Sequence, residues 1–361
     1  MPKLSVIIPV HNGAKKLPRS VKSILDQSFK DYELILVENG STDSSWQVCQ
    51  MLQRKDERII ITQSELSTSF ARKKGIEIAE GEYITFCDCD DLYYDRKSLA
   101  RMVDIADQTK SDIIQFGYYI NRFGKLTRYV TSEQMTIDRV ALLDRYIAGA
   151  IGSYKDAINL AVWNKMYKNN PVKLAAEKMD KPLIKTEDGY LNTYTFFEDS
   201  VKSVTFSSQC FYVYYTGIGF SGTADAGQKL FEEYRITKPI ALALARKHQC
   251  GKTVFIKCYR EILNFLHSLI IQCIISGKSE KEVIDIIREY TSWSFVKEAS
   301  DYFLNDDYAW DDHILRLSQI ENAEMYYHMC LSDITDLPMK RIQYQAKWSV
   351  KNTLRWIDKL L

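Results

Sequence analysis

Three aspartates stand within four residues, directly after a predicted strand. Asp88, Asp90 and Asp91 follow the apolar run 83–87. Carboxylates this close repel one another unless a cation or a hydrogen-bond network compensates their charge. Hard divalent cations such as Mn²⁺ or Mg²⁺ take oxygen ligands and share their shell with water and substrate phosphates, so Asp88 and Asp90 predict a metal site. An acidic turn in which Asp91 or Asp95 caps the next helix explains the pattern equally well.

Polar residues also stand where two earlier predicted strands end. The first strand runs into His11 and Asn12, and the second runs into Glu38 and Asn39. Such residues can hydrogen-bond a ligand, but asparagine also favours left-handed turns. Turn chemistry around Gly40 is therefore the alternative for the second pair.

Two further groups of charged residues lie later in the chain. Arg72 shares a predicted helix with neighbouring lysines, so it is either an anion ligand or part of an exposed basic face. Glu187 and Asp188 follow Thr186, and a carboxylate beside a reacting hydroxyl can act as a general base. The alternative is that Thr186 caps a helix and the two acids stabilise its N-terminus.

These residues need elements that bring them together, and the first 120 residues alternate strand and helix patterns. Strands alternating with helices across short turns indicate an α/β fold with a mostly parallel sheet flanked by helices. Ligands of such sheets bind beyond the carboxyl ends of the strands, where the polar groups stand. The predicted strands are 4–10, 32–37, 59–61, 83–87 and 113–116, and predicted helices include 17–25 and 71–79.

The remainder of the chain predicts a change of architecture. Residues 201–206 and 210–215 predict a later pair of strands, and beyond residue 222 the pattern is almost wholly helical. We expect three regions, 1–222, 223–338 and 339–361. The helices expected beyond residue 222 are 230–245, 254–275, 280–290 and 314–329.

The amino-acid composition excludes some classes of protein. The chain has 361 residues, 46% of them hydrophobic and 26% charged, which excludes a long disordered protein. Its formal net charge of +1 gives no sign of a nucleic-acid partner. The eight cysteines include no Cys-x-x-Cys pair, so we expect no structural zinc. A strand pattern in place of a signal peptide at the start, and an apolar stretch at 266–275 too short to span a bilayer, lead us to expect a cytoplasmic protein with reduced thiols and no membrane span.

Several motifs follow one another in order along the amino-terminal part of the chain: SVIIPVHN at 5–12, SFKDYEL at 28–34, VENGSTD at 37–43, ARKKG at 71–75 and GEYITF at 81–86, followed by the aspartates. This series resembles the family 2, nucleotide-sugar-dependent glycosyltransferases of the GT-A fold, especially bacterial enzymes of surface polysaccharide synthesis. The resemblance is detailed over residues 4–120, thinner over 155–222 and absent beyond.

The resemblance implies roles for the amino-terminal residues. The turn from Pro9 through His11 to Asn12 would line the nucleotide site. Glu38 and Asn39 replace two aspartates that are usual in the family, one of which contacts the base. Arg72 would assist the diphosphate, and Lys73 departs from the usual asparagine. Asp88-Cys89-Asp90 matches the Asp-x-Asp motif, with Asp90 as ligand of Mn²⁺ or Mg²⁺ and Asp88 near the ribose or the metal's waters.

A second landmark implies the catalytic base. After WNKMYK at 163–168, the family places a Glu-Asp pair, which nominates Asp188 with Glu187 as the close alternative. Trp163 is then either a core residue or a platform for the acceptor. The implied enzyme is a metal-dependent, inverting hexosyl- or N-acetylhexosaminyl-transferase. It would move a sugar from a nucleotide diphosphate donor, expected to be UDP-linked, to a glycan or lipid-linked acceptor in capsule or cell-envelope synthesis.

The carboxyl-terminal end predicts a separate surface. Residues 280–338 carry 14 Asp/Glu and 4 Lys/Arg, a net of −10, whereas residues 339–361 carry 6 Lys/Arg and one acid, a net of +5. Residues 340–361 predict a basic amphipathic helix that docks either on an anionic membrane surface, making the protein peripheral, or on the acidic segment before it. The region 223–338 would shape the acceptor site or pair subunits in an oligomer.

Two other functions fit parts of the pattern. A sugar nucleotidyltransferase would carry a glycine-rich phosphate loop early in the chain, and no Gly-x-Gly-x-x-Gly follows the first strand. A non-catalytic scaffold would bind the nucleotide sugar without turnover.

Overall fold

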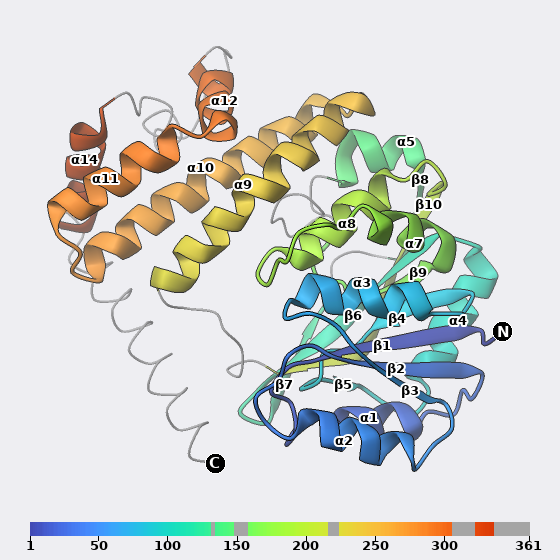
Figure 1. Ribbon diagram of the computed structural model, residues 1–361. Helices are drawn as coiled ribbons and strands as arrows, with labels where there is room; N and C mark the ends of the chain where they lie inside the picture. Colours follow the sequence, from blue (N-terminus) through green and yellow to red (C-terminus); the bar gives the residue numbers. More distant parts are fainter. Residues whose placement is uncertain (131–133, 148–157, 216–223, 305–321, 336–361) are drawn as a thin grey trace. The chain divides into compact units, whose positions relative to one another are not determined.

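Strands and helices alternate through the first 86 residues, as the sequence predicts (Figure 1). The computed structural model describes residues 1–130, 134–147, 158–215, 224–304 and 322–335. β1 pairs in parallel with β2 and β4, and β2 pairs in parallel with β3. The elements are β1 (Leu4–Val10), α1 (Leu17–Leu25), β2 (Tyr32–Glu38), α2 (Ser45–Gln53), β3 (Ile59–Gln63), α3 (Thr68–Ile78) and β4 (Tyr83–Phe86).

Burial explains why these strands are continuous apolar runs. Every residue of β1, β2 and β4 is buried, because helices cover both faces of the parallel sheet. α3 approaches β1 closely at Gly75, where a Cβ atom would lie 2.5 Å from Cγ2 of Ile7. This close approach brings the side chains of α3 near the sheet.

Strands of both directions complete the sheet beyond β4. Its order is β3-β2-β1-β4-β9-β6-β10-β5, with β7 paired to β6 and β8 paired to β10. β6 and β10 are parallel, while β9 runs antiparallel to both β4 and β6. The predicted α/β class is confirmed. The added elements are β5 (Leu92–Tyr93), α4 (Ser98–Thr109), β6 (Ile113–Arg122), β7 (Lys125–Tyr129), β8 (Met135–Asp138), α5 (Arg139–Ala141), the π-helical turn η1 (Leu142–Tyr146), β9 (Lys165–Lys168), α7 (Asn169–Glu177), α8 (Glu187–Phe197) and β10 (Ser203–Tyr215).

The predicted strand pair at 201–206 and 210–215 is wrong. β10 is one strand, and its register against β6 shifts between Ser207 and Cys210 and again between Cys210 and Tyr212. The polar residues at 207–209 form a β-bulge instead of a turn, because β6 continues to pair beyond them.

The chain divides into two compact units. The first comprises Met1–Thr216 with Leu244–Gly251, and the second comprises Gly217–Ala243 with Lys252–Leu361. All described elements after β10 are helical, and a capping box of Ser279 and Glu282 begins α11. They are α9 (Ala224–Lys247), α10 (Lys252–Ile275), α11 (Glu280–Thr291), α12 (Ser294–Leu304) and α14 (Ala323–Thr335).

Some sequence-based expectations fall beyond these elements. Residues 314–321 of the helix predicted at 314–329, and the basic helix predicted at 340–361, lie outside the described residues. Within the described part of the chain, no helix has the length and hydropathy of a membrane-spanning segment. All eight cysteines lie in the described residues, and none of them forms a disulfide there.

Candidate active site

Hydrogen bonds connect the loop after β1 to the loop after β2 at the carboxyl edge of the sheet. Asn12 has a positive φ of 50°, and its Oδ1 accepts a hydrogen bond from the amide of Thr42 at 2.8 Å. His11 Nδ1 lies 3.1 Å from the backbone oxygen of Asn39. Pro9 is buried within β1, opposite Val37 of β2. The predicted nucleotide-binding turn is thus anchored to its neighbour.

Glu38 and Asn39 differ in how many hydrogen-bond partners the protein gives their side chains. Burial raises the pKa of Glu38, but hydrogen bonds from Ser41 and Gln63 outweigh it and hold the pKa below its ordinary value. The Ser41 amide donates at 2.5 Å and Gln63 Nε2 donates at 2.8 Å. By contrast, Asn39 Oδ1 is buried and has no hydrogen-bond partner among the described residues. The Glu38 carboxylate therefore stabilises the turn, whereas Asn39 Oδ1 is available to accept a hydrogen bond from a ligand.

The three aspartates after β4 have separate environments. Asp91 is a structural anchor, because its carboxylate accepts hydrogen bonds from the Tyr212 hydroxyl at 2.9 Å and the Tyr215 amide at 2.8 Å. Asp90 is partly exposed, and its Oδ2 lies 3.5 Å from Lys16 Nζ. Asp88 Oδ1 lies 3.4 Å from Arg72, described next. Neither Asp91 nor Asp95 caps α4, whose N-cap residue is Lys97 without a side-chain capping bond; Asp95 instead stabilises the preceding turn by accepting a hydrogen bond from the Lys97 amide at 2.9 Å.

Arg72 brings three carboxylates together from distant parts of the sequence. Its side chain, on α3, is 3% exposed, and Nη1 donates to Glu187 Oε1 at 2.9 Å. The same guanidinium forms an ion pair with Asp188 and reaches Asp88 through Nη2. Glu187 and Asp188 form the first turn of α8, where acids are also favourable, so the two sequence-based interpretations of this pair are compatible.

Burial and repulsion perturb the carboxyl groups of this cluster. Burial raises the pKa of Glu187 to about 8, with Arg72 lowering it and Asp188 adding to the rise. Burial also raises the pKa of Asp88 to about 6, opposed by Arg72 and reinforced by Asp188 and Asp90. Burial lowers the pKa of Arg72, but the three carboxylates outweigh it and keep the guanidinium charged. Such perturbed groups at the carboxyl edge of a sheet mark a candidate active site.

A buried lysine positions the loop beside this cluster. Lys165 begins β9, and its Nζ donates to the backbone oxygens of Asn159 and Ala161 and to the side chain of Asn164. Within the same loop, the Val162 amide donates to Asp188 Oδ2 at 3.3 Å. Burial lowers the pKa of Lys165 to about 7, against the charge of Asp188. Sequence reasoning missed this role, although Lys165 stands within the WNKMYK motif.

Trp163 packs in an aromatic cluster. Its ring is 8% exposed and stacks on Tyr212 and Tyr214, with centroids 4.8 and 5.3 Å away. Tyr118 meets it edge-on at 4.7 Å. Of the two interpretations of Trp163, the geometry favours the core residue.

A divalent cation fits the chemistry of this site. Across the described residues, no three or more His, Cys, Asp or Glu side chains are grouped as a metal site. However, the contacts of Asp88 with Arg72 and of Asp90 with Lys16 are long for ion pairs, and the two carboxylates repel each other. With Glu187 and Asp188 also present, acids outnumber the nearby cations, so an anionic ligand would require added positive charge.

Comparisons with known proteins agree with this architecture. Residues 5–169 match the family model "Glycosyl transferase family 2". A glycosyltransferase of Streptococcus pneumoniae serotype 4, GlyG, is 32% identical over 144 residues, which are 38% of this chain and 47% of GlyG. TarP of Staphylococcus aureus, a poly(ribitol-phosphate) beta-N-acetylglucosaminyltransferase, is 28% identical over 160 residues, 43% of this chain and 48% of TarP. The chain thus spans about half the length of these curated relatives.

A solved structure resembles more of the chain. The crystal structure of S. aureus TarS 1-349 in complex with UDP-GlcNAc covers 92% of this chain and 92% of its own, with a TM-score of 0.67 and 17% identity. This likeness establishes the fold. The family match over residues 5–169 confirms the predicted resemblance to the family 2 glycosyltransferases.

Proposed function

We propose that this chain, whose residues 5–169 match glycosyl transferase family 2, transfers a sugar from a nucleoside diphosphate donor to a hydroxyl of a glycan or lipid-linked acceptor. One observation carries the proposal. Arg72 gathers Asp88, the expected donor-side residue, and Asp188, the expected base, around one guanidinium. The two halves of a transfer site are thereby adjacent.

The donor is proposed to be a UDP-sugar. The unpartnered, buried Oδ1 of Asn39 suits the imide N–H of uracil, which needs a hydrogen-bond acceptor. His11, Asn12 and Pro9 line the neighbouring turn. The name of TarP, a beta-N-acetylglucosaminyltransferase, and the UDP-GlcNAc in the crystal structure of TarS 1-349 agree with this choice of donor.

Asp188 is proposed to act as the general base. It would accept the proton of the acceptor hydroxyl while that oxygen attacks the anomeric carbon, and the bond to the nucleoside diphosphate would break with its electron pair leaving on the phosphate. The Val162 amide and Arg72 hold Asp188 from two sides, and its side chain, at 23% exposed, is more accessible than that of Glu187 at 12%. Single displacement inverts the anomeric centre, consistent with the β linkage in the name of TarP.

Asp90, with Asp88 beside it, is proposed to hold Mn²⁺ or Mg²⁺. Such an ion supplies positive charge to the leaving diphosphate. Arg72 is too deeply buried among carboxylates to be the main diphosphate ligand, so we assign it to positioning Asp88 and Asp188.

The test is the release of nucleoside diphosphate from UDP-, GDP- and TDP-sugars with Mn²⁺, in the presence and absence of EDTA. We expect one UDP-sugar to be hydrolysed slowly, and we expect EDTA or Asp90→Ala to abolish the reaction. Asp104→Ala, at an exposed position on α4, is the matched control.

If no donor is turned over, the same panel read as thermal shifts separates the alternatives. A metal-dependent shift with UDP-sugars that Asp90→Ala removes would indicate an intact donor site that needs its acceptor. Donor binding with no transfer to any acceptor, and no effect of Asp188→Asn, would instead support a non-catalytic scaffold.

A further inference from the structure

The β6–β7 hairpin presents one face that the proposed reaction does not explain. It turns through Phe123 and Gly124, both with positive φ, and the Asn121 side chain accepts the Gly124 amide at 2.9 Å. All of β7 is exposed. The cross-strand pairs define what we term the hairpin face: Tyr118 with Tyr129, Ile120 with Thr127, and Arg122 with Lys125.

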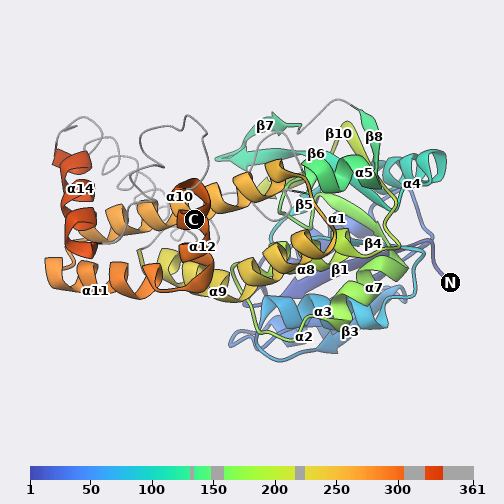
Figure 2. The same cartoon turned by 90° about the horizontal axis from the view of Figure 1, so that it is seen from above.

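Aromatic rings connect the hairpin face to the candidate active site. Tyr129, 45% exposed, stacks on Tyr118 with centroids 5.6 Å apart. Tyr118 contacts Trp163, and Trp163 stacks on Tyr214. Burial raises the pKa of Tyr214 to about 12, with further contributions from the charges of Asp91, Asp88, Asp90 and Asp188. A row of rings therefore extends from the carboxylates to the outer strand of the sheet, where Figure 2 shows β7 beside β6.

All charged side chains of the hairpin are positive. Residues 118–130 contain Arg122, Lys125 and Arg128 and no acid. In the described part of the chain, Arg122 and Lys125 form no ion pair, and both are exposed at the outer end of the hairpin face. A surface with these cations and an aromatic row is complementary to a chain that alternates phosphates with C–H-rich polyol or sugar units.

We propose that the hairpin face binds the acceptor, and that the acceptor is an anionic, phosphodiester-linked polyol chain. Arg122 and Lys125 pair with its phosphates, while Tyr129 and Tyr118 pack against its carbon skeleton. This inference rests on the proposed function, because it names the acceptor of that site. The name of TarP, a transferase acting on poly(ribitol-phosphate), is consistent with this chemistry.

The first test is equilibrium binding of a synthetic, fluorescent ribitol-phosphate oligomer to the full chain. The double variant R122E/K125E should weaken binding by about tenfold or more, and added salt should reduce the affinity of the wild type. R54E/K55E is the matched control, since it makes the same charge change at exposed positions after α2, and it should stay within about twofold. Equal losses in both variants would overturn the proposal.

A second pair of variants tests the aromatic part. Tyr129→Ala should weaken oligomer binding by about threefold to tenfold. Tyr94→Ala is its control: Tyr94 is 43% exposed and stacks on Tyr119 at 4.3 Å, but Tyr119 points to the opposite face of the sheet. Tyr94→Ala should leave binding unchanged, and a loss matching that of Tyr129→Ala would contradict the assignment to one face.

UDP release without acceptor separates this inference from the proposed function. All four variants should hydrolyse the donor at the wild-type rate. If the wild type shows neither donor hydrolysis nor a donor-induced thermal shift, the proposed function is contradicted, whereas the oligomer measurement is independent of that outcome. Failure of the wild type to bind the oligomer overturns the inference. So does binding of phosphatidylglycerol vesicles in its place, because the face would then be a membrane contact.

Discussion

The two ends of the parallel strands use charged residues in opposite ways. At the amino ends, Lys3 pairs with Glu82 and Asp107, each at 2.8 Å, and all three side chains are between 21% and 54% exposed. At the carboxyl ends, the Arg72 side chain is 3% exposed and faces an excess of carboxylates. Water screens the first group and cannot screen the second.

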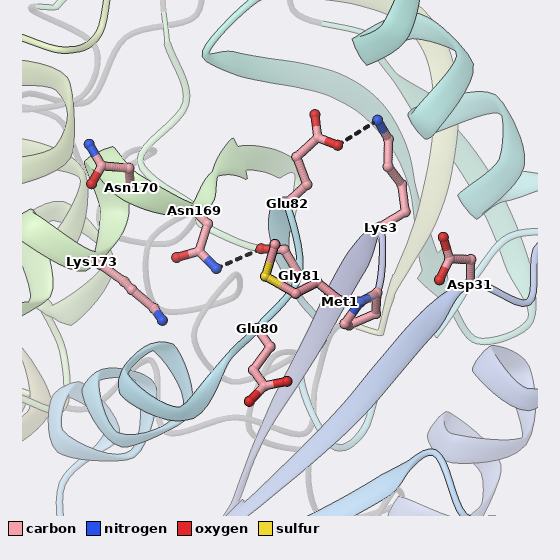
Figure 3. A pocket seen from close by; sticks show the side chains of 10 residues that line it. Met1, Lys3, Asp31, Glu80, Gly81, Glu82, Asn169, Asn170 and Lys173 are labelled. Carbon is pink, nitrogen blue, oxygen red and sulfur yellow. Dashed lines mark hydrogen bonds and ion pairs between the residues drawn. The ribbon is translucent and has the colours of Figure 1, made fainter.

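The amino end nevertheless holds a sizeable pocket, of about 540 Å³. Figure 3 shows Lys3 paired with Glu82 and Asn169 bonded to the Gly81 backbone at its wall. Of its charged side chains, Lys3 and Glu82 pair with each other, and Asp31 and Glu80 are exposed to water. The difference teaches that volume alone does not select a candidate site, and that the carboxyl edge differs by its repelling carboxylates around one guanidinium.

The largest effect should come from removing the central cation. Arg72→Met leaves three carboxyl groups without their guanidinium, so we expect loss of transfer activity and a decrease of about 3–5 kcal/mol in the free energy of unfolding near neutral pH. Urea denaturation and a transfer assay measure the two effects. The loss of stability should shrink at acidic pH, where the carboxyl groups carry protons. If the variant is as stable and active as the wild type, the ion pairs of Arg72 contribute no more than ordinary ion pairs at a protein surface.

Next in size is the removal of the proposed base. Asp188→Asn should decrease kcat for transfer about 10²- to 10⁴-fold with little change in donor binding, because it removes proton acceptance and keeps the shape. Steady-state transfer and a donor titration give the two quantities. Glu187→Gln is the matched comparison, and a greater loss of kcat in that variant would move the base to Glu187.

The pH dependence of stability should also distinguish the two ends. The pKa of Glu187 is raised by burial from its ordinary 4.5 to about 8, so the folded state holds a proton that the unfolded state releases between these values. The resulting stabilisation is complete below the unfolded pKa and is lost as pH rises through the folded one. Unfolding free energy should therefore fall between about pH 5 and about pH 8.5 in the wild type.

The control for this effect is Glu187→Gln, which cannot titrate. Denaturant titrations of both proteins at each pH should give a flatter profile for the variant. The raised pKa of Asp88, at about 6, contributes the same sign at lower pH and remains in both. Parallel profiles would mean that the pKa of Glu187 is the same in the folded and unfolded states.

The smallest effect is expected at the amino end. Lys3→Ala breaks the pairs with Glu82 and Asp107, and it should change the free energy of unfolding by no more than about 1 kcal/mol. Donor hydrolysis should stay at the wild-type rate. A large loss of activity would show that the two ends are coupled and would remove the contrast on which these predictions rest.

The local sequence pattern was sufficient to predict the strands in the first half of the sheet. β1, β2 and β4 are buried on both faces, so each appears as a short apolar run ended by polar residues. The bulge in β10 could not be predicted in this way, because Ser207 and its polar neighbours resemble a turn unless the pairing with β6 is known. A strand's continuation there depends on its neighbour in space.

The sequence by itself determined the α/β class, the resemblance to a glycosyltransferase family and the positions of the acidic residues. Only the tertiary structure decided how those acids differ. Asp91 is fixed by Tyr212 on β10, while Asp88 and Asp188, 100 residues apart, meet at Arg72. Spacing along a chain constrains neighbours on one element, but the burial and charge that tune a carboxyl group come from elements that only folding brings together.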